Sequence, residues 1–203
     1  MAIIYHEHRD TLVLTGLLLA LALLKAEACS RFTYTGPNNT VITGRSMDWM
    51  TDVHTDLWVF PAGISRVGAN DPNGLKWTSK YGSVIASGYD VATTDGINSQ
   101  GLDANLLYLA NTKFPEKQAG QADLSVLNWA QYMLDNYATV DEAVKGFTQQ
   151  KLNMIAPTLP DGNYPAVHLA LTDKTGDNAV FEYINGKLTI HHGKQYIGLW
   201  INL

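Results

Sequence analysis

The only cysteine of this 203-residue chain is Cys29, and it directly follows a segment with the pattern of an export signal. An apolar run over residues 12–24 is followed by the small-residue box Ala26-Glu27-Ala28, which is typical of a signal-peptidase site. Cleavage after Ala28 would make Cys29 the first residue of the mature chain. We therefore predict that residues 1–28 are a signal peptide, and that residues 29–203 form one domain that is periplasmic or secreted.

Two other interpretations of this leader fit its residues less well. The apolar run is shorter than the about 20 residues that span a bilayer, so no stable membrane anchor is expected after cleavage. A lipoprotein also begins at a cysteine, but its recognition box has a large aliphatic residue where this chain has Ala26. A periplasmic binding lipoprotein, with Cys29 lipid-bound or buried, is therefore kept only as an alternative.

The composition limits the classes of partner. The chain has a formal net charge of −5, with 46% hydrophobic and 16% charged residues, which is ordinary for a globular domain. It has no basic stripe, so nucleic acid is not an expected partner. One cysteine cannot form an intramolecular disulfide, and an exposed thiol is a liability in an oxidising compartment.

A mature N-terminal cysteine has a particular chemistry. Its thiol is a nucleophile and its α-amine is a base, and covalent geometry holds the two at close range. N-terminal-nucleophile hydrolases use this arrangement. The structural alternative is a buried and inert cysteine, but the position of Cys29 favours a thiol that is used.

The first half of the chain reads as short strands separated by turns. Alternation of polar and apolar residues, bounded by turn residues such as Gly36-Pro37-Asn38-Asn39, is typical of strands in a layered sheet. The predicted strands cover residues 30–35, 41–49, 57–60, 83–89 and 102–109.

The second half begins with helices and ends in a meander. A helix is predicted over residues 123–136, and the capping box Thr139-Val140-Asp141-Glu142 opens a second one that runs to about residue 150. Strands then follow, the last two joined by the hairpin turn Asn185-Gly186. They cover residues 167–172, 179–184 and 187–192. Strands around a helical pair predict an α+β layered architecture.

Three short motifs lie along these predicted elements. They are Cys29-Ser30-Arg31-Phe32, then Gly44-Arg45-Ser46-Met47-Asp48-Trp49, then Gly96-Ile97-Asn98 with Gly101-Leu102. In combination they resemble the choloylglycine hydrolase family of linear-amide hydrolases, which comprises bile salt hydrolases and penicillin V acylases. The tracts 76–84 and 105–108 look closest to its Gram-negative penicillin-acylase-like branch. The resemblance implies the αββα fold of N-terminal-nucleophile hydrolases.

The same resemblance implies catalytic roles for four residues. Cys29 would be the nucleophile, with Arg45 beside the sulfur and Asp48 beside the amine. Elementary electrostatics supports these roles, because a guanidinium favours a thiolate and a carboxylate stabilises a protonated amine. The alternative for Arg45 and Asp48 is a surface ion pair, which contributes little. Tyr108 falls where the family places a backbone amide of the oxyanion hole.

The remaining polar and aromatic residues receive lesser roles. Trp49 and Met50 are predicted to form the wall of the substrate pocket, and Ser46 is interpreted as structural. No metal and no cofactor is expected. His191 and His192 are neighbours on a strand and point to opposite faces, and the other histidines have no companions at ligand spacing.

The end of the chain departs from the family pattern. After Tyr196 the family continues through an asparagine that supplies the second oxyanion donor, whereas this chain ends with residues 197–203, and Asn202 does not match that position. The resemblance therefore implies that the C-terminal part of the fold is missing.

The resulting hypothesis is an exported cysteine amidase that hydrolyses a linear C–N amide bond of a small molecule. The sequence does not decide between three substrate types: penicillin V, an acyl-homoserine lactone and a conjugated bile salt. Whether the protein forms a homo-oligomer is also undecided by the sequence. The alternative within the same fold is an inactive truncated remnant.

Overall fold

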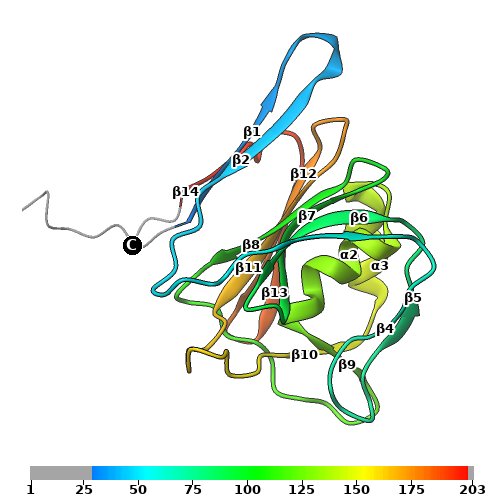
Figure 1. The fold of residues 1–203 in the computed structure, drawn as a ribbon, viewed down its shortest axis with the longest axis vertical. Helices are drawn as coiled ribbons and strands as arrows, with labels where there is room; N and C mark the ends of the chain where they lie inside the picture. Colours follow the sequence, from blue (N-terminus) through cyan, green and yellow to red (C-terminus); the bar gives the residue numbers. More distant parts are fainter. Residues whose placement is uncertain (1–28, 201–203) are drawn as a thin grey trace, which may run out of the picture.

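The computed structural model describes residues 29–200, so the predicted signal peptide lies outside the described residues. Its centre is a seven-stranded antiparallel sheet with the strand order β13-β12-β11-β8-β7-β6-β3 (Figure 1). The strands are β3 (Leu57–Phe60), β6 (Ser83–Gly88), β7 (Ala92–Asn98), β8 (Asp103–Tyr108), β11 (Val167–Thr172), β12 (Asn178–Ile184) and β13 (Lys187–His192). Helices on one face of this sheet give the α+β fold that the sequence predicts.

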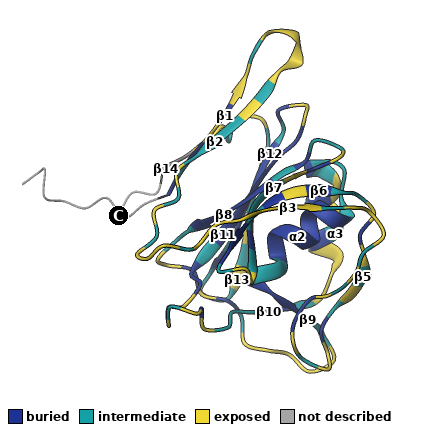
Figure 2. Ribbon diagram, in the orientation of Figure 1, coloured by how far each residue is buried: buried dark blue, intermediate teal, exposed yellow. Residues whose placement is uncertain are grey.

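The helices α2 (Trp129–Asn136) and α3 (Val140–Gln149) cover one face of the sheet (Figure 1). Alternate residues of the strands, such as Leu169 and Phe181, point into this layer and are fully buried. The indole of Trp129 lies at its centre, with ring centroids 5.9 Å from Phe147 and 6.4 Å from Phe181. Figure 2 shows the helices and the strands beneath them as the buried part of the molecule.

Local signals in the sequence explain where α3 begins. The hydroxyl of Thr139 accepts a hydrogen bond from the backbone N–H of Glu142 at 3.2 Å, and the Glu142 carboxylate accepts one from Ala138 N at 2.9 Å. The predicted capping box is therefore confirmed. It satisfies N–H groups that otherwise have no partner at a helix start.

The helix predicted over residues 123–136 is wrong in its first part. Residues Ala122–Ser125 form strand β9, which pairs in parallel with β10 (Leu152–Ile155). The short 3-10 helix η2 (Val126–Asn128) follows, and α2 begins only at Trp129. The reason is tertiary: the buried Asp123 carboxylate accepts a hydrogen bond from Asn153 of β10 at 2.8 Å, a contact that local periodicity cannot predict.

Strands β1 (Ser30–Thr35) and β2 (Val41–Arg45) form a hairpin that projects beyond the main sheet at the top of Figure 1. They make a separate three-stranded sheet with β14 (Gly198–Trp200), and a further two-stranded sheet joins β4 (Ser65–Val67) to β5 (Lys76–Thr78). The strand predicted over 41–49 therefore ends earlier, at Arg45. Beyond it the chain leaves the sheet and crosses toward the pocket described below.

The base of this hairpin is anchored on the face of the main sheet that the helices do not cover. Arg31 is 3% exposed, and its guanidinium donates to Asn105 at 2.6 Å and to Thr172 at 2.6 Å. It also pairs with the Asp103 carboxylate at 3.1 Å. Because a buried cation needs partners on all its donors, this network fixes the start of β1, and thus Cys29, over the C-terminal end of β8.

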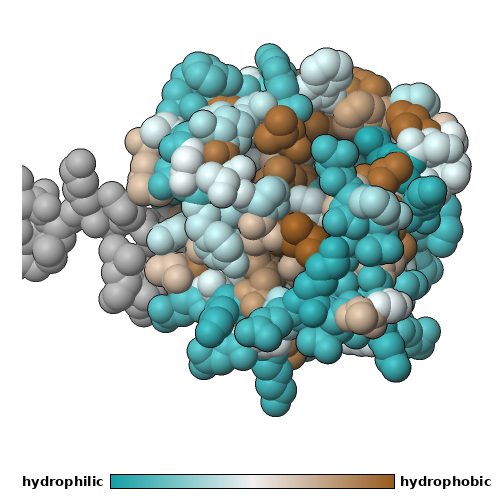
Figure 3. Space-filling model, turned by 90° about the horizontal axis from the view of Figure 1, so that it is seen from below, coloured by the Kyte–Doolittle hydropathy of each residue, from teal (hydrophilic) through white to brown (hydrophobic). Residues whose placement is uncertain are grey.

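Among residues 29–200, no helix is long and apolar enough to cross a membrane. Apolar side chains do reach the surface on the face shown in Figure 3, where they lie in patches between polar ones.

Candidate active site

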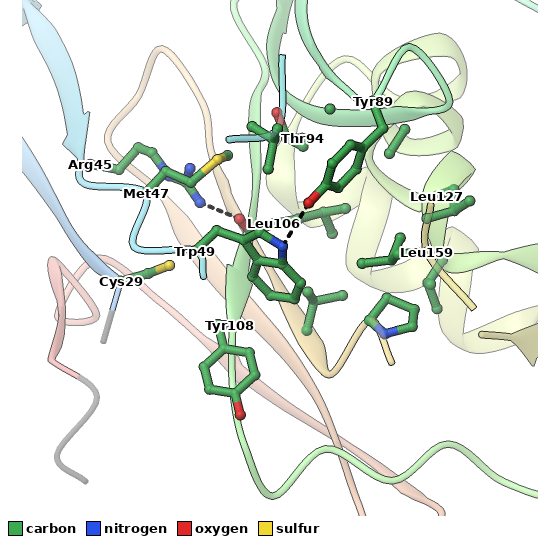
Figure 4. A pocket seen from close by; sticks show the side chains of 16 residues that line it. Cys29, Arg45, Met47, Trp49, Tyr89, Thr94, Leu106, Tyr108, Leu127 and Leu159 are labelled. Atoms are coloured by element: carbon green, nitrogen blue, oxygen red, sulfur yellow. Dashed lines mark hydrogen bonds between the residues drawn. The ribbon is translucent and has the colours of Figure 1, made fainter. Parts of the chain in front are cut away.

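Cys29 lies at one end of a pocket, at the start of β1 (Figure 4). It is 2% exposed and packs against Leu107, Ala170 and Tyr108. Its sulfur is 3.9 Å from the backbone carbonyl oxygen of Asp48. The sole thiol of the chain is thus held in a defined place, with one side open to the pocket.

The pocket forms where two strands of the main sheet separate. Strand β7 pairs with β8 only from Ile97–Asp103 to Asp95–Asn105. At the same level the register of β6 and β7 shifts between Ala86 and Ser87, which makes Thr94 an extra residue. Such a bulge bends and twists a strand, and here it carries β7 away from β8. Thr94 itself lines the pocket.

Arg45 occupies the gap between the separated strands. Its Nε is 3.3 Å from Oδ1 of Asp95, and its Nη2 donates to the backbone carbonyl of Leu106. Asp95 is held in turn by the amide of Asn105, whose Nδ2 donates to it at 3.1 Å. The Asn105 oxygen also accepts from Arg31, so the guanidinium of Arg45 belongs to a continuous network that reaches the base of the hairpin.

The geometry of β8 turns particular backbone groups toward this gap. Leu109 N donates to Ala166 before β11, whereas the carbonyl of Leu102 accepts from Asn98 of β7. Because neighbouring residues of a strand face opposite partners, the backbone groups of Leu106 and Tyr108 face the side that β7 has left. Arg45 takes the carbonyl of Leu106, and the amide of Tyr108 faces the same side. The Tyr108 ring packs edge-on against Trp49, with centroids 5.8 Å apart.

The wall of the pocket is almost entirely apolar, as Figure 4 shows for the labelled residues. Besides Cys29, Arg45 and Thr94, the lining side chains and backbone belong to Met47, Trp49, Val53, Gly88, Tyr89, Ala92, Leu106, Tyr108, Val126, Leu127, Leu159, Pro165 and Val167. The pocket therefore runs from the thiol, through the gap between the strands, toward η2 on the helical side of the sheet.

The structure does not bring all the predicted site residues into this pocket. Cys29, Arg45, Trp49 and Tyr108 line it, whereas Met50 does not and is 58% exposed. The placement of Met50 in the wall is therefore corrected, and Met47 takes that place. Exposure alternates along residues 45–50, as in an extended chain, so Trp49 and its neighbour Met50 face opposite sides.

The carboxylate of Asp48 is exposed and also lies outside the lining. It accepts a hydrogen bond from the hydroxyl of Ser46 at 3.1 Å, and that hydroxyl accepts one from the backbone N–H of Ser30 at 3.1 Å. Ser46 thus connects Asp48 to the residue next to Cys29. This is a structural role for Ser46, and it keeps the Asp48 carboxylate close to the start of β1.

A buried histidine reports the electrostatics behind Cys29. His168 of β11 is 1% exposed and pairs across the sheet with Leu107, which contacts Cys29. Burial, and then the positive charges of Arg31 and Arg45, lower the pKa of His168 to about 4. The imidazole is therefore neutral at pH 7, and the two guanidinium groups that oppose its protonation are each paired with a carboxylate, Arg31 with Asp103 and Arg45 with Asp95.

Two residues near the pocket were missed by the sequence analysis. Asp95 fixes Arg45, and Asp161, described below, binds Trp49 and Tyr89. Neither lies in a recognisable motif, although Asp161-Gly162 is a turn signal. Among residues 29–200, no group of three or more His, Cys, Asp or Glu side chains is placed to hold a metal ion.

Comparison with known proteins identifies the family. The model for linear amide C–N hydrolases of the choloylglycine hydrolase family matches residues 29–200. The chain belongs to this family. The resemblance drawn from the motifs is thereby confirmed.

Individual relatives agree with this assignment. The penicillin V acylase of Pectobacterium atrosepticum is 49% identical over 179 residues, which are 83% of this chain and 48% of the relative. The solved structure of penicillin V acylase from Agrobacterium tumefaciens is similar with a TM-score of 0.78 at 52% identity, covering 84% of this chain and 51% of that one. The chain spans about half the length of the relatives it matches.

A more distant relative has the same fold. A variant of the conjugated bile acid hydrolase from Clostridium perfringens gives a TM-score of 0.68 at 22% identity, over 81% of this chain and 51% of that one. This similarity concerns the fold alone. With the closer relatives, it confirms the N-terminal-nucleophile hydrolase fold expected from the sequence.

Proposed function

We propose that this chain, once residues 1–28 are removed, is a cysteine amidase that hydrolyses linear C–N amides with an apolar acyl group. The observation that carries the proposal is the position of Cys29. It is the only cysteine, it is the first residue of the match to the family, and it lines the same apolar pocket as Arg45.

The first step is attack by the thiolate. The free α-amine of Cys29 takes the thiol proton, while the positive charge of Arg45 favours the thiolate. The sulfur forms a bond with the amide carbon, and the carbonyl electron pair moves to oxygen. The backbone amide of Tyr108, which faces the gap between the strands, is available to donate to this oxyanion. One such donor is worth roughly 10²–10³-fold in rate.

The second step returns the proton and breaks the amide. The protonated amine gives its proton to the leaving nitrogen, the C–N bond breaks, and a thioester remains on Cys29. The amine then takes a proton from a water molecule whose oxygen attacks the thioester carbon. The C–S bond breaks, the acid leaves, and the amine returns the proton to the sulfur of Cys29. The Asp48 carboxylate, tied to the start of β1 through Ser46, would stabilise the amine in its protonated form.

The apolar lining favours an acyl group made of hydrocarbon. Aromatic and aliphatic side chains dominate the wall, so the burial of a phenyl ring or an alkyl chain would supply most of the binding energy. Penicillin V, whose acyl group is phenoxyacetyl, is the substrate named in two of the relatives. Acyl-homoserine lactones fit the same description.

Export is part of this proposal, because Cys29 has no free amine until the chain is cut after Ala28. Replacement of Ala28 by Trp would block the cleavage box. N-terminal sequencing should show that this variant retains residues 1–28. An assay of penicillin V hydrolysis should show that it is inactive. Full amidase activity from an uncleaved chain would contradict the mechanism.

The central experiment compares three chains in the hydrolysis of penicillin V: the wild-type chain from residue 29 onward, and the Cys29→Ala and Asp48→Asn variants of that chain. Cys29→Ala should abolish release of the free amine, and Asp48→Asn should reduce it severely with the fold retained. Each chain is also tested after extension with the second half of a penicillin V acylase, since this chain spans about half of such relatives. Hydrolysis by the Cys29→Ala chain at the wild-type rate would refute the proposal.

A further inference from the structure

One carboxylate, that of Asp161, accepts hydrogen bonds from several polar groups around the pocket. Oδ2 of Asp161 accepts hydrogen bonds from the indole of Trp49 at 3.0 Å, the phenol of Tyr89 at 2.7 Å and the hydroxyl of Thr51 at 3.0 Å. The side chain of Asn163 donates to the same oxygen at 2.9 Å, and its backbone N–H donates to Oδ1 at 3.0 Å. We call these five residues the Asp161 clasp.

The clasp joins three segments that are far apart in the sequence. Trp49 and Thr51 follow β2, Tyr89 lies between β6 and β7, and Asp161 precedes β11. Each segment also contributes to the pocket wall, the third through Leu159 and Pro165. Asp161 is not part of the lining, so it acts on the pocket through the residues that it holds.

The pKa of Asp161 and the backbone conformation of Tyr89 both indicate that the hydrogen bonds of the clasp are specific. Partial burial would raise the pKa of Asp161, but the donors of Asn163, then Tyr89 and Trp49, outweigh it and hold the pKa far below its usual range. Tyr89 has a φ of 54°, a left-handed conformation that is unfavourable for a residue with a bulky side chain. Its hydrogen bond to Asp161 offsets that strain and holds the ring in place.

We propose that Asp161 is a positioning residue that sets the shape and the selectivity of the acyl pocket. By binding the polar ends of Trp49 and Tyr89, it turns their aromatic surfaces toward the pocket, as their orientation in Figure 4 illustrates. This inference deepens the proposed function and rests on it, since it names the residue that adapts the pocket to its acyl group.

The clasp has a consequence for the chemical class of the acyl group. The indole N–H and the phenol O–H both donate to Asp161, and the phenol oxygen also accepts from the indole N–H at 3.1 Å and lies 2.5 Å from the Thr51 hydroxyl, so neither group is free to pair with a polar group of the ligand. A hydroxyl buried against them would lose its bonds to water without compensation. The pocket should therefore select acyl groups that have a flat apolar end and disfavour those that are hydroxylated there.

The test uses the single thiol as a reporter and needs no hydrolysis. Iodoacetamide and iodoacetanilide have the same reactive carbon and differ by a phenyl ring. Alkylation of Cys29 is followed by intact mass for both reagents, and each rate is divided by the rate with glutathione. The ratio of the two normalised rates is the phenyl preference of the pocket. Because it is measured by alkylation, a chain without amidase activity still gives an answer.

The variants are Asp161→Ala and Asp161→Asn, with Asp71→Asn as the matched control. Asp71 begins a similar turn, with its Oδ1 accepting from Asn73 N at 2.9 Å, but it lies outside this pocket. The wild-type chain should show a phenyl preference of several-fold. Asp161→Ala should abolish it, Asp161→Asn should at least halve it, and Asp71→Asn should leave it unchanged.

Circular dichroism establishes that each variant is folded. If both Asp161 variants fail to fold, Tyr89→Phe replaces them, since it removes a single donor and keeps the ring. A reduced phenyl preference in Tyr89→Phe would then support the proposal, and an unchanged preference would overturn it. A wild-type phenyl preference retained in the folded variants, or the absence of any preference in the wild-type chain, would overturn the proposal. On a chain with a second half added, the same variants should raise KM for penicillin V more than they lower kcat.

Discussion

The guanidinium of Arg45 donates a hydrogen bond to the backbone carbonyl of Leu106 at the point where β8 has lost β7 as its neighbour. A carbonyl left without a strand partner costs free energy unless another donor reaches it. Arg45 supplies that donor and also lines the same pocket as Cys29. One side chain thus fills the gap in the sheet and places a guanidinium in the wall of the pocket that contains the thiol, which ties the candidate chemistry to the fold.

Replacement of Arg45 by Lys should therefore impair the site. The planar guanidinium reaches Asp95 and Leu106 at once, which the single ammonium of a lysine cannot do. We expect amide hydrolysis to fall roughly 10²-fold, the effect of losing one charge-stabilising donor. Alkylation of Cys29 by iodoacetamide at pH 7 should also slow. The matched control is Arg66→Lys, since Arg66 pairs with Asp135 away from the pocket, and equal effects of the two variants would remove Arg45 from the mechanism.

The resemblance motif Gly96-Ile97-Asn98 has a packing explanation that can be tested. A Cβ at Gly96 would lie 2.7 Å from Ile85 Cγ2, 2.8 Å from Leu134 Cδ1 and 2.9 Å from the backbone oxygen of Val84, so an alanine forces the packing between α2 and the sheet to shift. We expect Gly96→Ala to lower the free energy of unfolding by about 1–3 kcal/mol, measured by urea denaturation. Val84→Ala, on the uncovered face of the neighbouring strand, is the control and should cost less. An unchanged midpoint for Gly96→Ala would show that α2 can move freely.

His168 should make stability depend on pH. Its pKa is lowered to about 4 in the folded chain, from an ordinary value of 6.5. Below the ordinary value the unfolded chain takes up a proton that the folded chain does not, so stability is complete above pH 6.5 and falls as the pH drops to 4. The loss is on the order of 3 kcal/mol.

The variant that tests this is His168→Leu. Neither ring nitrogen of His168 makes a hydrogen bond within residues 29–200, although Glu182 Oε1 is 3.7 Å from Nδ1, so an apolar side chain of similar size can replace it. Urea unfolding at pH 7, 5.5 and 4.5 should show a weaker pH dependence in this variant. The control is His54→Asn, which removes a histidine side chain that is 78% exposed. An identical pH dependence in His168→Leu and wild type would contradict the assignment.

The sequence predicted the elements that local patterns determine. Strands β1, β3, β11 and β13 have the predicted bounds, because β-branched and aromatic residues fill them and turn residues or polar residues flank them. Strand β7 was missed, since its polar run Thr93-Thr94-Asp95 is held by neighbouring strands rather than by its own pattern. The start of α2 was placed too early for the same reason, because β9 depends on a distant partner.

The site divides in a similar way. Cys29 and Arg45 could be found from position and spacing, and both line the pocket. Asp95 and Asp161 could not, because their contacts depend on how separate segments meet in space. Trp49 and Met50 are neighbours, and only the alternation of the chain after β2 decides which one faces the pocket.

The last prediction concerns strand β3, which lies at one edge of the main sheet. Its residues Leu57 and Val59 are 78% and 75% exposed, and they pair with β6 on the face that the helices do not cover. An exposed, apolar edge strand is a template for pairing with another chain.

We therefore expect a chain of residues 29–203 to self-associate through this edge as its concentration rises. The double variant Leu57→Lys, Val59→Lys should shift it toward the monomer in analytical ultracentrifugation. Pairing of two edges would bring the lysines of both chains together and bury them, and both effects oppose association. Val67→Lys is the control, since Val67 is 52% exposed but lies on β4, outside the main sheet. If the β3 variant and the control associate to the same extent as the wild-type chain, the contact between chains lies elsewhere and the edge of β3 is not the interface.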